Sequence, residues 1–210
     1  IQIRIGFIAF LILLLNFLIC WKTGFFIPLI LGIPITLSLV APFFDVPALK
    51  KSGDIIYYSP LFLAEKQKKD KITVHGGTLF DYFFVIDRNL NGRKRMNFIL
   101  QQYLEGLNRL IDRLEQENSE NLTIHGTSYI LNERTAQKLG FHVVQTDFLQ
   151  RCNLIYNYFN LMVANSLAKG KWTFPRLGET KTFEAKLFDL IQRRDFIKNL
   201  EEKLKLRQLA

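Results

Sequence analysis

The stretch SYILNERTAQKLGFHVV, residues 128–144, carries the clearest fold signal in the chain. It reads as the end of a strand, a short helix and a second strand. Asn132 is a residue type that caps a helix N-terminus through its side-chain oxygen. Gly140 supplies the left-handed conformation with which many helices end. The stretch therefore predicts a strand, a short helix from about 133 to 139, and a strand that begins with FHVV.

The elements upstream of this stretch extend the pattern. ITVHGGTLFDYFFVID, residues 72–87, reads as a strand, a turn at Gly76 and Gly77, and a strongly apolar second strand over 79–86. Residues 96–117 repeat apolar side chains at three- and four-residue spacing, which predicts a helix that the polar stretch 116–121 ends. LTIHGTSYIL, residues 122–131, is the next strand. A strand, a helix crossover and another strand form a βαβ unit.

The first 44 residues have a different character. Residues 5–21 and 25–44 contain no charged side chain, and Lys22 is the only charge between Ile5 and Phe44. A helix of about 20 apolar residues crosses a hydrocarbon core of roughly 30 Å. We expect a two-helix transmembrane hairpin, with WKTG at its turn. A secretory signal peptide is the alternative, but a second apolar run follows the first at once.

Prolines mark the second apolar segment. Pro28 can lie in the first helical turn, where its missing N–H costs little. Pro34 is expected to kink the helix, and Pro42 follows in the same segment. One interpretation is a kink that serves helix packing. The other is a cleft for a lipid or acyl chain.

Charge predicts the orientation of the hairpin. The chain has 28 Lys and Arg against 19 Asp and Glu, a net charge of +9. Six lysines closely follow the second apolar segment: Lys50, Lys51, Lys66, Lys68, Lys69 and Lys71. Because positive residues near helix ends favour the cytoplasmic side, both termini and the C-terminal domain are expected there. These lysines could also contact anionic headgroups of membrane lipids. Dispersed charge without a recognition motif argues against nucleic-acid binding.

Four parts follow from this survey: a transmembrane hairpin at 1–44, a connector at 45–71, a core domain at 72–147 and C-terminal helices at 148–210. Residues 148–168 are apolar nearly all round, and residues 181–208 place apolar side chains on one helical face. These two helices are the expected surfaces for protein partners.

A basic loop precedes the long helix. The loop RNLNGRKR, residues 88–95, holds Arg88, Arg93, Lys94 and Arg95. Free N–H groups at a helix N-terminus bind phosphate, so this loop is the expected anion site. A solvated basic loop is the alternative.

Two motifs resemble the GNAT superfamily of N-acyltransferases over residues 72–147. NGRKRMNFIL, residues 91–100, lies where the family has an RGxGxGxxLL run. NERTAQKLGF, residues 132–141, is similar to the helix that precedes the family's last conserved strand. The resemblance implies an α+β fold with a mixed sheet and flanking helices. In the family, the loop amides hold the pyrophosphate of acyl-coenzyme A, and the strand after the helix splays from its neighbour.

Carried over residue by residue, the resemblance implies acyl-CoA binding at Asn91, Gly92, Arg93, Lys94, Arg95 and Asn132. An acyl-carrier thioester is the alternative donor. The chain departs from the family pattern where Lys94 and Met96 replace loop glycines, because a side chain obstructs close approach to a ligand. The tyrosine that family members often place in the short helix as general acid is missing.

Few side chains are suited to proton transfer. His125, in the strand that would border the acyl cleft, is the candidate catalytic base. A structural hydrogen bond is the alternative role. Asp81 interrupts an apolar run and is expected to have a structural partner such as an arginine. No metal-ligand spacing occurs in the sequence.

The sequence thus leads to two hypotheses. One is a membrane-anchored acyltransferase that moves an acyl group from a thioester to an amine near the cytoplasmic membrane face. The other is a non-catalytic, membrane-anchored structural or assembly subunit of a larger complex.

Overall fold

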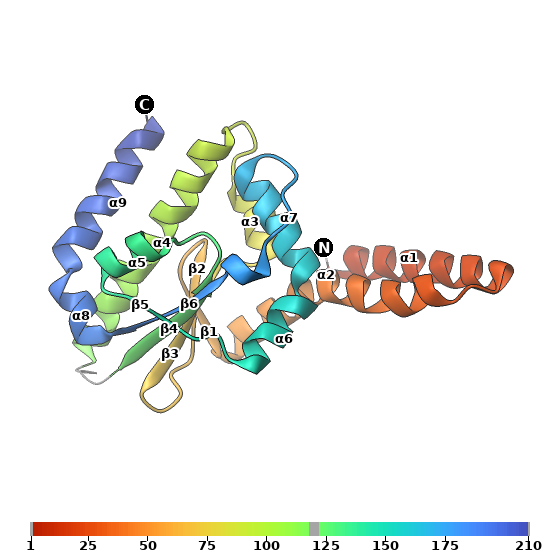
Figure 1. The fold of residues 1–210 in the computed structure, drawn as a ribbon, viewed down its shortest axis with the longest axis horizontal. Helices are drawn as coiled ribbons and strands as arrows, with labels where there is room; N and C mark the ends of the chain where they lie inside the picture. Colours follow the sequence, from red (N-terminus) through yellow and green to blue (C-terminus); the bar gives the residue numbers. More distant parts are fainter. Residues whose placement is uncertain (1, 118–121, 210) are drawn as a thin grey trace.

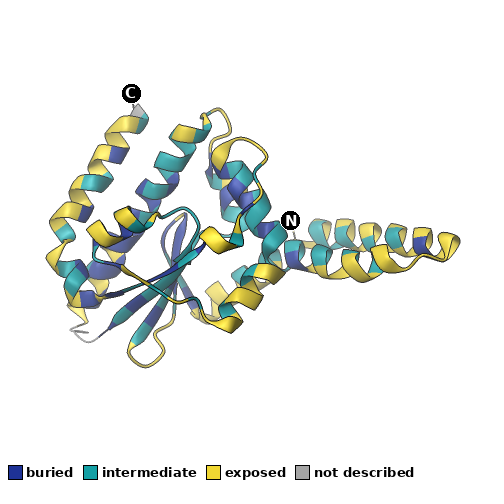
Figure 2. Cartoon of the chain, viewed as in Figure 1, coloured by how far each residue is buried: buried dark blue, intermediate teal, exposed yellow. Residues whose placement is uncertain are grey.

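Two long apolar helices project from an α+β domain in the computed structural model, which describes residues 2–117 and 122–209 (Figure 1). Helices α1 (Gln2–Thr23) and α2 (Ile27–Ser52) form a hairpin. At ~1.5 Å per residue they measure about 33 and about 39 Å. Both are long and apolar enough to cross a membrane. Most of their side chains are exposed (Figure 2).

Other helices satisfy two carbonyl groups that prolines of α2 leave without a helical partner. Pro42 cannot donate to the carbonyl of Ser38, and the side-chain amide of Asn160 donates to it instead at 2.5 Å. Pro47 likewise frees the carbonyl of Phe43, which accepts from the Gln2 amide at 2.9 Å. The turns at Pro42 and Pro47 are therefore sites of helix packing.

A six-stranded mixed sheet forms the centre of the domain, with strand order β1-β2-β3-β4-β6-β5. Its strands are β1 (Ile55–Ser59), β2 (Phe62–Glu65), β3 (Lys71–Gly76), β4 (Thr123–Ser128), β5 (His142–Val144) and β6 (Lys181–Lys186). Strands β3 and β4 are parallel, and the other neighbours are antiparallel. The crossover between the parallel strands contains α4 (Gly92–Gln116). The predicted α+β class with a mixed sheet is confirmed.

The remaining helices surround this sheet. They are α3 (Leu79–Val85), α5 (Glu133–Leu139), α6 (Phe148–Tyr156), α7 (Tyr158–Lys169), the 3-10 turn η1 (Leu177–Glu179), α8 (Leu187–Gln192) and α9 (Arg194–Leu209). In the stretch 128–144 the short helix and the second strand fold as predicted, but β4 ends at Ser128 and residues 129–131 are not part of the strand. The Asn132 side chain accepts from the N–H of Thr135 at 2.8 Å, and Gly140 ends α5 at φ 101°.

The prediction of a strand over 79–86 is wrong, because these residues form α3. Its N-terminus is a capping box, in which the Thr78 hydroxyl accepts from the N–H of Asp81 and the Asp81 carboxylate accepts from the N–H of Thr78. Asp81 also accepts from the hydroxyl of Tyr57 at 2.9 Å. Its partners are thus a threonine and a tyrosine, not an arginine.

Three further expectations need correction. Residues 181–186 are strand β6 between β4 and β5, so a helix begins only at Leu187. The helix expected over 148–168 breaks at Asn157 into α6 and α7. Residues 45–71 are no separate connector, because α2 continues to Ser52 and β1 and β2 belong to the sheet. α4 ends at Gln116 as expected, and residues 118–121 of the stretch expected to end it lie outside the described residues.

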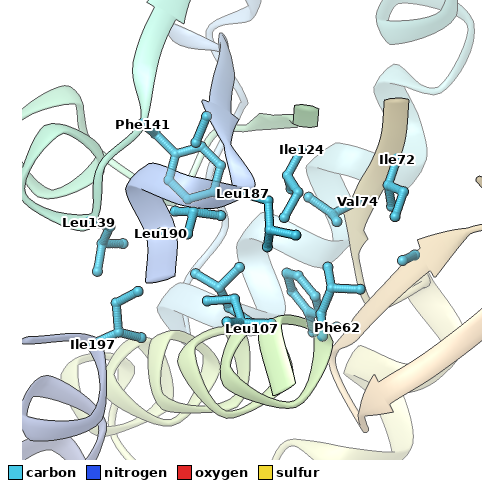
Figure 3. Close-up of a cluster of buried hydrophobic side chains, with 14 of the residues drawn as sticks. Phe62, Ile72, Val74, Leu107, Ile124, Leu139, Phe141, Leu187, Leu190 and Ile197 are labelled. Atoms are coloured by element: carbon cyan, nitrogen blue, oxygen red, sulfur yellow. The ribbon is translucent and has the colours of Figure 1, made fainter. Parts of the chain in front are cut away.

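The main core lies between one face of the sheet and helices α4, α8 and α9 (Figure 3). Phe62 and Ile124 from the sheet pack with Leu107, Leu187 and Ile197 from the three helices. The other face of β3, β4 and β6 carries polar side chains, among them Lys71, His125 and Glu184. Strand alternation fixes this division, since neighbouring residues point to opposite faces.

Candidate functional site

The parallel strands β3 and β4 part at their carboxyl ends. Their pairing runs from Lys71 with Thr123 to Val74 with Gly126, and His75 and Gly76 continue without a partner on β4. A slot of about 70 Å³ lies between the diverging ends and α4. We call it the inner slot; its lining includes Val74, Leu100, Gly126 and Ser128. Ligands of α/β proteins commonly bind outside the carboxyl ends of parallel strands.

A larger space of about 530 Å³ adjoins the inner slot. This outer chamber is walled by the C-terminal half of α2, the link from β3 to α3, the end of β4, and helices α6 and α7. The two spaces share the lining residues His75, Gly76, Tyr103, Thr127 and Ser128. Together they form one strand-end cleft.

Tyrosine hydroxyls gather at the junction of the two spaces. The hydroxyls of Tyr82 and Tyr103 lie 2.8 Å apart. Burial raises the pKa of Tyr103 to about 12 and also raises the pKa of Tyr129. These hydroxyls are neutral at physiological pH, so they can donate hydrogen bonds to a ligand. Gly76 is required here because a side chain would collide with the hydroxyl of Tyr103.

A histidine–carboxylate pair stands at the same place. Nε2 of His75 lies 2.9 Å from Oε1 of Glu65 on the neighbouring strand. The hydrogen bond with His75 is the main cause that lowers the pKa of Glu65 to about 2. The ionised carboxylate orients the imidazole of His75, which by strand alternation lies on the same face of β3 as Lys71, at the edge of the cleft that His75 helps to line. This arrangement suits His75 to accept a proton from a bound substrate.

His125, the predicted base, is placed elsewhere. It lies on the polar face of β4, with Nε2 4.0 Å from Oε1 of Glu184, which in turn pairs with Lys71 at 2.6 Å. Burial, and then the charge of Lys71, lower the pKa of His125. Neither the inner slot nor the outer chamber includes His125 among its lining residues. The structure thus separates this histidine from the cleft.

The predicted phosphate loop is also away from the cleft. α4 begins at Gly92, and Leu100 lines the cleft eight residues later, about 12 Å along the helix at ~1.5 Å per residue. Gly92 packs directly against the carbonyl of Lys169 at the end of α7. This packing places the end of α7 against the helix N-terminus that was expected to receive a diphosphate.

The other predicted binding residues have structural roles or point to solvent. The Asn91 side chain caps α4 by accepting from the N–H of Lys94 at 2.9 Å. The Arg95 guanidinium donates to the carbonyls of Leu167 and Arg88 at 2.8 and 2.6 Å. Arg93 is exposed. Asn132 caps α5.

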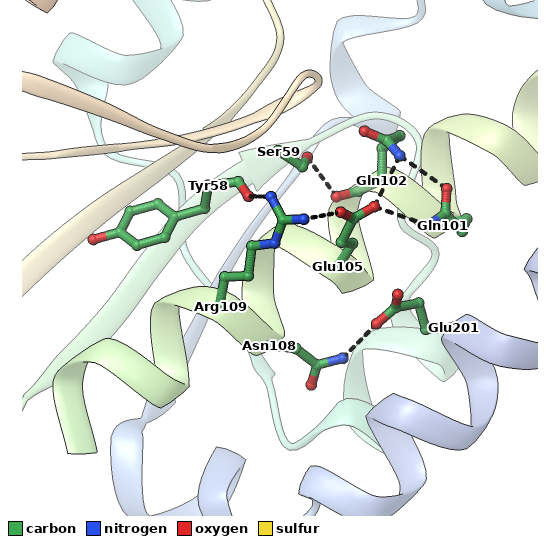
Figure 4. A network of polar contacts seen from close by, with 8 residues as sticks. All are labelled: Tyr58, Ser59, Gln101, Gln102, Glu105, Asn108, Arg109 and Glu201. Carbon is green, nitrogen blue, oxygen red and sulfur yellow. Dashed lines mark hydrogen bonds and ion pairs between the residues drawn. The ribbon is translucent and has the colours of Figure 1, made fainter. Parts of the chain in front are cut away.

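A second, polar groove of about 570 Å³ lies between α4 and α9 (Figure 4). Glu105 accepts from the amides of Gln101 and Gln102 at 3.1 and 3.0 Å, and Glu201 accepts from Asn108 at 2.7 Å. Gln102 and Asn108 are only 8% and 6% exposed. The side-chain oxygen of each is buried without a hydrogen-bond partner among the described residues.

Sequence reasoning missed the residues that line the strand-end cleft. The assignment of 79–86 to a strand hid Tyr82, and Tyr103 was assigned only to the apolar face of a helix. The pair Thr78 and Asp81 is a capping-box signal that would have predicted α3. Within residues 2–117 and 122–209, no group of three or more His, Cys, Asp or Glu is placed to hold a metal ion.

Comparisons with known proteins found no family model, no curated protein and no solved structure that matches the chain.

Proposed function

We propose that the chain is a membrane-anchored, GNAT-like acyltransferase that moves an acyl group from a thioester to an amine near the cytoplasmic membrane face. The observation that carries this proposal is the strand-end cleft between the parallel strands β3 and β4. The GNAT resemblance places the acyl donor between a strand and the strand that splays from it. The inner slot is the corresponding space in this chain.

The hairpin of α1 and α2 is proposed as the membrane anchor. The length of α1, about 33 Å, matches a hydrocarbon core of roughly 30 Å. Lys50 and Lys51 lie in the last turn of α2, and the lysine-rich stretch 66–71 follows. By the positive-inside tendency, this end of the hairpin and the whole domain face the cytoplasm.

The donor proposed is a thioester on a pantetheine arm, with an acyl-carrier thioester favoured over acyl-CoA. The end of α7 packs against the helix N-terminus that would hold the diphosphate of coenzyme A, and Arg95 is tied to backbone carbonyls. A donor that binds only through its acyl and pantetheine parts needs no contact at the N-terminus of α4. The chain should therefore gain little affinity from the nucleotide part of coenzyme A.

The reaction can be assigned to groups at the cleft. The acceptor amine attacks the thioester carbonyl, and His75, oriented by Glu65, accepts the proton that the amine loses. The hydroxyls of Tyr103 and Ser128 donate to the oxyanion that forms. The C–S bond then breaks, the new C–N bond remains, and the leaving thiolate takes the proton from His75.

Release of free thiol tests this proposal. The protein in lipid nanodiscs is mixed with palmitoyl-pantetheine or palmitoyl-CoA and a mixture of primary amines, and thiol is measured with a chromogenic disulfide. We expect amine-dependent thiol release from both donors. A Tyr103→Phe variant should be slower by roughly 10²-fold, as for the loss of one oxyanion donor. No amine-dependent release from either donor would contradict the proposal.

A non-catalytic subunit is the second candidate function. The groove between α4 and α9 favours it, because the buried oxygens of Gln102 and Asn108 have no hydrogen-bond partner among the described residues, and another chain could supply one. Phe188, Phe196 and Leu206 expose large apolar side chains on α8 and α9. This function predicts co-purification with other chains in mild detergent, and a clean monomer would count against it.

A further inference from the structure

One wall of the outer chamber belongs to the helix proposed as the membrane anchor. Ala41, Pro42, Asp45, Val46 and Leu49 of α2 line the chamber. Helix α7 faces them with Asn160, Leu161 and Ala164. The chamber is therefore not enclosed by the α+β domain alone, since its boundary is shared with the hairpin.

The corner between α6 and α7 meets α2 well before that helix ends. The Ser38 hydroxyl donates to the carbonyl of Tyr156 at 3.1 Å, and Asn160 donates to the carbonyl of Ser38. From Ile27 to Ser38, α2 covers only about 17 Å at ~1.5 Å per residue. A hydrocarbon core is roughly 30 Å thick, so in a spanning hairpin the corner lies at bilayer level.

The side chains of the corner suit that position. Ile155 and Tyr156 are 63% and 52% exposed, and Phe148 and Leu149 at the start of α6 are also exposed. In Figure 1 the corner lies at the base of the hairpin, on the side from which α1 and α2 project. Exposed aliphatic and aromatic side chains beside an anchor are suited to contact with the bilayer.

The lining of the chamber is mostly apolar on the side of α2 and α7, although Asp45 and Asn160 of these helices also line it. Apolar side chains come mainly from α2 and α7, among them Ala41, Val46, Leu161 and Ala164. Hydroxyl and amide groups come from the strand ends and from α6, among them Ser128, Gln150 and Asn153. A molecule with one hydrocarbon chain and a polar head matches this division.

We propose that the outer chamber takes the hydrocarbon chain of a membrane-resident acyl substrate, which enters sideways from the bilayer. The chain lies along α2 and α7, and the reacting carbonyl reaches the strand ends beside His75. The identity of the reaction rests on the proposed function. Binding of the chain does not require turnover.

Photolabelling in vesicles tests the entry route. A C16 fatty acid with a diazirine near its methyl end is partitioned into vesicles that hold the full chain, and labelled peptides are mapped after irradiation. We expect label in α7 around Leu161 and in the hairpin, and little in α9. Equal labelling of α7 and α9 would overturn the proposal.

Two variants test whether the label on α7 arises from the outer chamber. Leu161→Trp fills the chamber and should reduce labelling of α7 about tenfold, a typical effect of overpacking on occupancy. Leu31→Trp, on the exposed face of α2 outside the chamber, should leave it unchanged. Undiminished labelling of α7 in Leu161→Trp would overturn the proposal. If Leu161→Trp does not fold, competition on the wild type decides: unlabelled palmitate should displace the α7 label and octanoate should not.

The outcomes separate this inference from the proposed reaction. Thiol release that is equally fast with acetyl- and palmitoyl-pantetheine, together with an unlabelled α7, would overturn lateral entry and leave the transferase. If the chamber is labelled but no thiol is released, the chamber binds a lipid chain and the transferase proposal is contradicted.

Discussion

At the scale of single residues, two histidines differ in position rather than in type. Both side chains belong to the polar face of the sheet, but His75, with Glu65 beside it, lines the strand-end cleft and His125 does not. We predict that His75→Gln lowers the rate of thiol release by about 10²- to 10⁴-fold, the usual contribution of a positioned base. His125→Gln is the matched control and should leave the rate unchanged. The opposite pattern would restore His125 as the base.

Glu65 gives a pH-dependent prediction. Its pKa is lowered from 4.5 to about 2, mainly by the hydrogen bond with His75. A lowered carboxyl pKa stabilises the fold above pH ~4.5, and this stability is lost as pH falls toward ~2. Glu65→Gln should therefore flatten the dependence of unfolding free energy on pH in that window, measured by denaturant titration. If Glu65→Gln leaves the pH dependence of the unfolding free energy in that window unchanged, the pair of Glu65 and His75 does not stabilise the fold.

Gly92 is predicted to be a packing residue rather than a ligand contact. A Cβ there would collide with the carbonyl of Lys169. Gly92→Ala should lower the unfolding free energy by about 1–3 kcal/mol, the usual cost of overpacking. Gly178→Ala is the control, because nothing lies within 4 Å of a Cβ at that position. If Gly92→Ala is as stable as the wild type but no longer binds the thioester, Gly92 would instead be a contact of the bound phosphate.

Residue identity alone could not place the site. The sequence shows which side chains titrate, but the face of β4 on which His125 lies depends on strand register. The packing of Gly92 depends on α7, which lies more than sixty residues away in sequence. Local signals such as the Asn132 cap and the Gly140 stop were predictable because they act within one turn.

At the scale of elements, the contact of α7 with α2 can be tested through a proline. Asn160→Ala leaves the carbonyl of Ser38 buried without a partner, at a cost of about 1–3 kcal/mol. Pro42→Ala supplies the missing N–H within α2. We predict that the double variant recovers most of the stability that Asn160→Ala loses, measured by thermal unfolding in nanodiscs. If the changes in stability of the two single variants simply add in the double variant, this account of the turn at Pro42 would be contradicted.

The errors in element assignment have physical causes. LFDYFFV, residues 79–85, is apolar enough for a buried strand, but the capping box at its start fixes a helix. KTFEAK, residues 181–186, has no strong signal of its own and becomes β6 by pairing with β4 and β5. Elements with strong local patterns, such as α4 and the two N-terminal helices, were predicted correctly because their periodicity or length is decisive.

At the scale of the whole molecule, the hairpin and the cleft form one unit. α2 contributes both to the proposed anchor and to the wall of the outer chamber. Removing residues 1–44 should therefore do more than release the domain from the membrane. We predict that the remaining domain binds palmitoyl-pantetheine more weakly than the full chain in nanodiscs, by isothermal titration. Equal affinity would show that the chamber is complete without the rest of the hairpin.

The central claim is that the strand-end cleft, and not the loop 91–96, receives the acyl thioester. The most direct test is the melting temperature of the purified chain with and without palmitoyl-pantetheine. We predict an upward shift that persists when Arg93 and Lys94 are replaced by alanine and disappears in Leu100→Trp, which fills the inner slot. A shift that survives Leu100→Trp and is lost with Arg93 and Lys94, or no shift at all, would contradict the account.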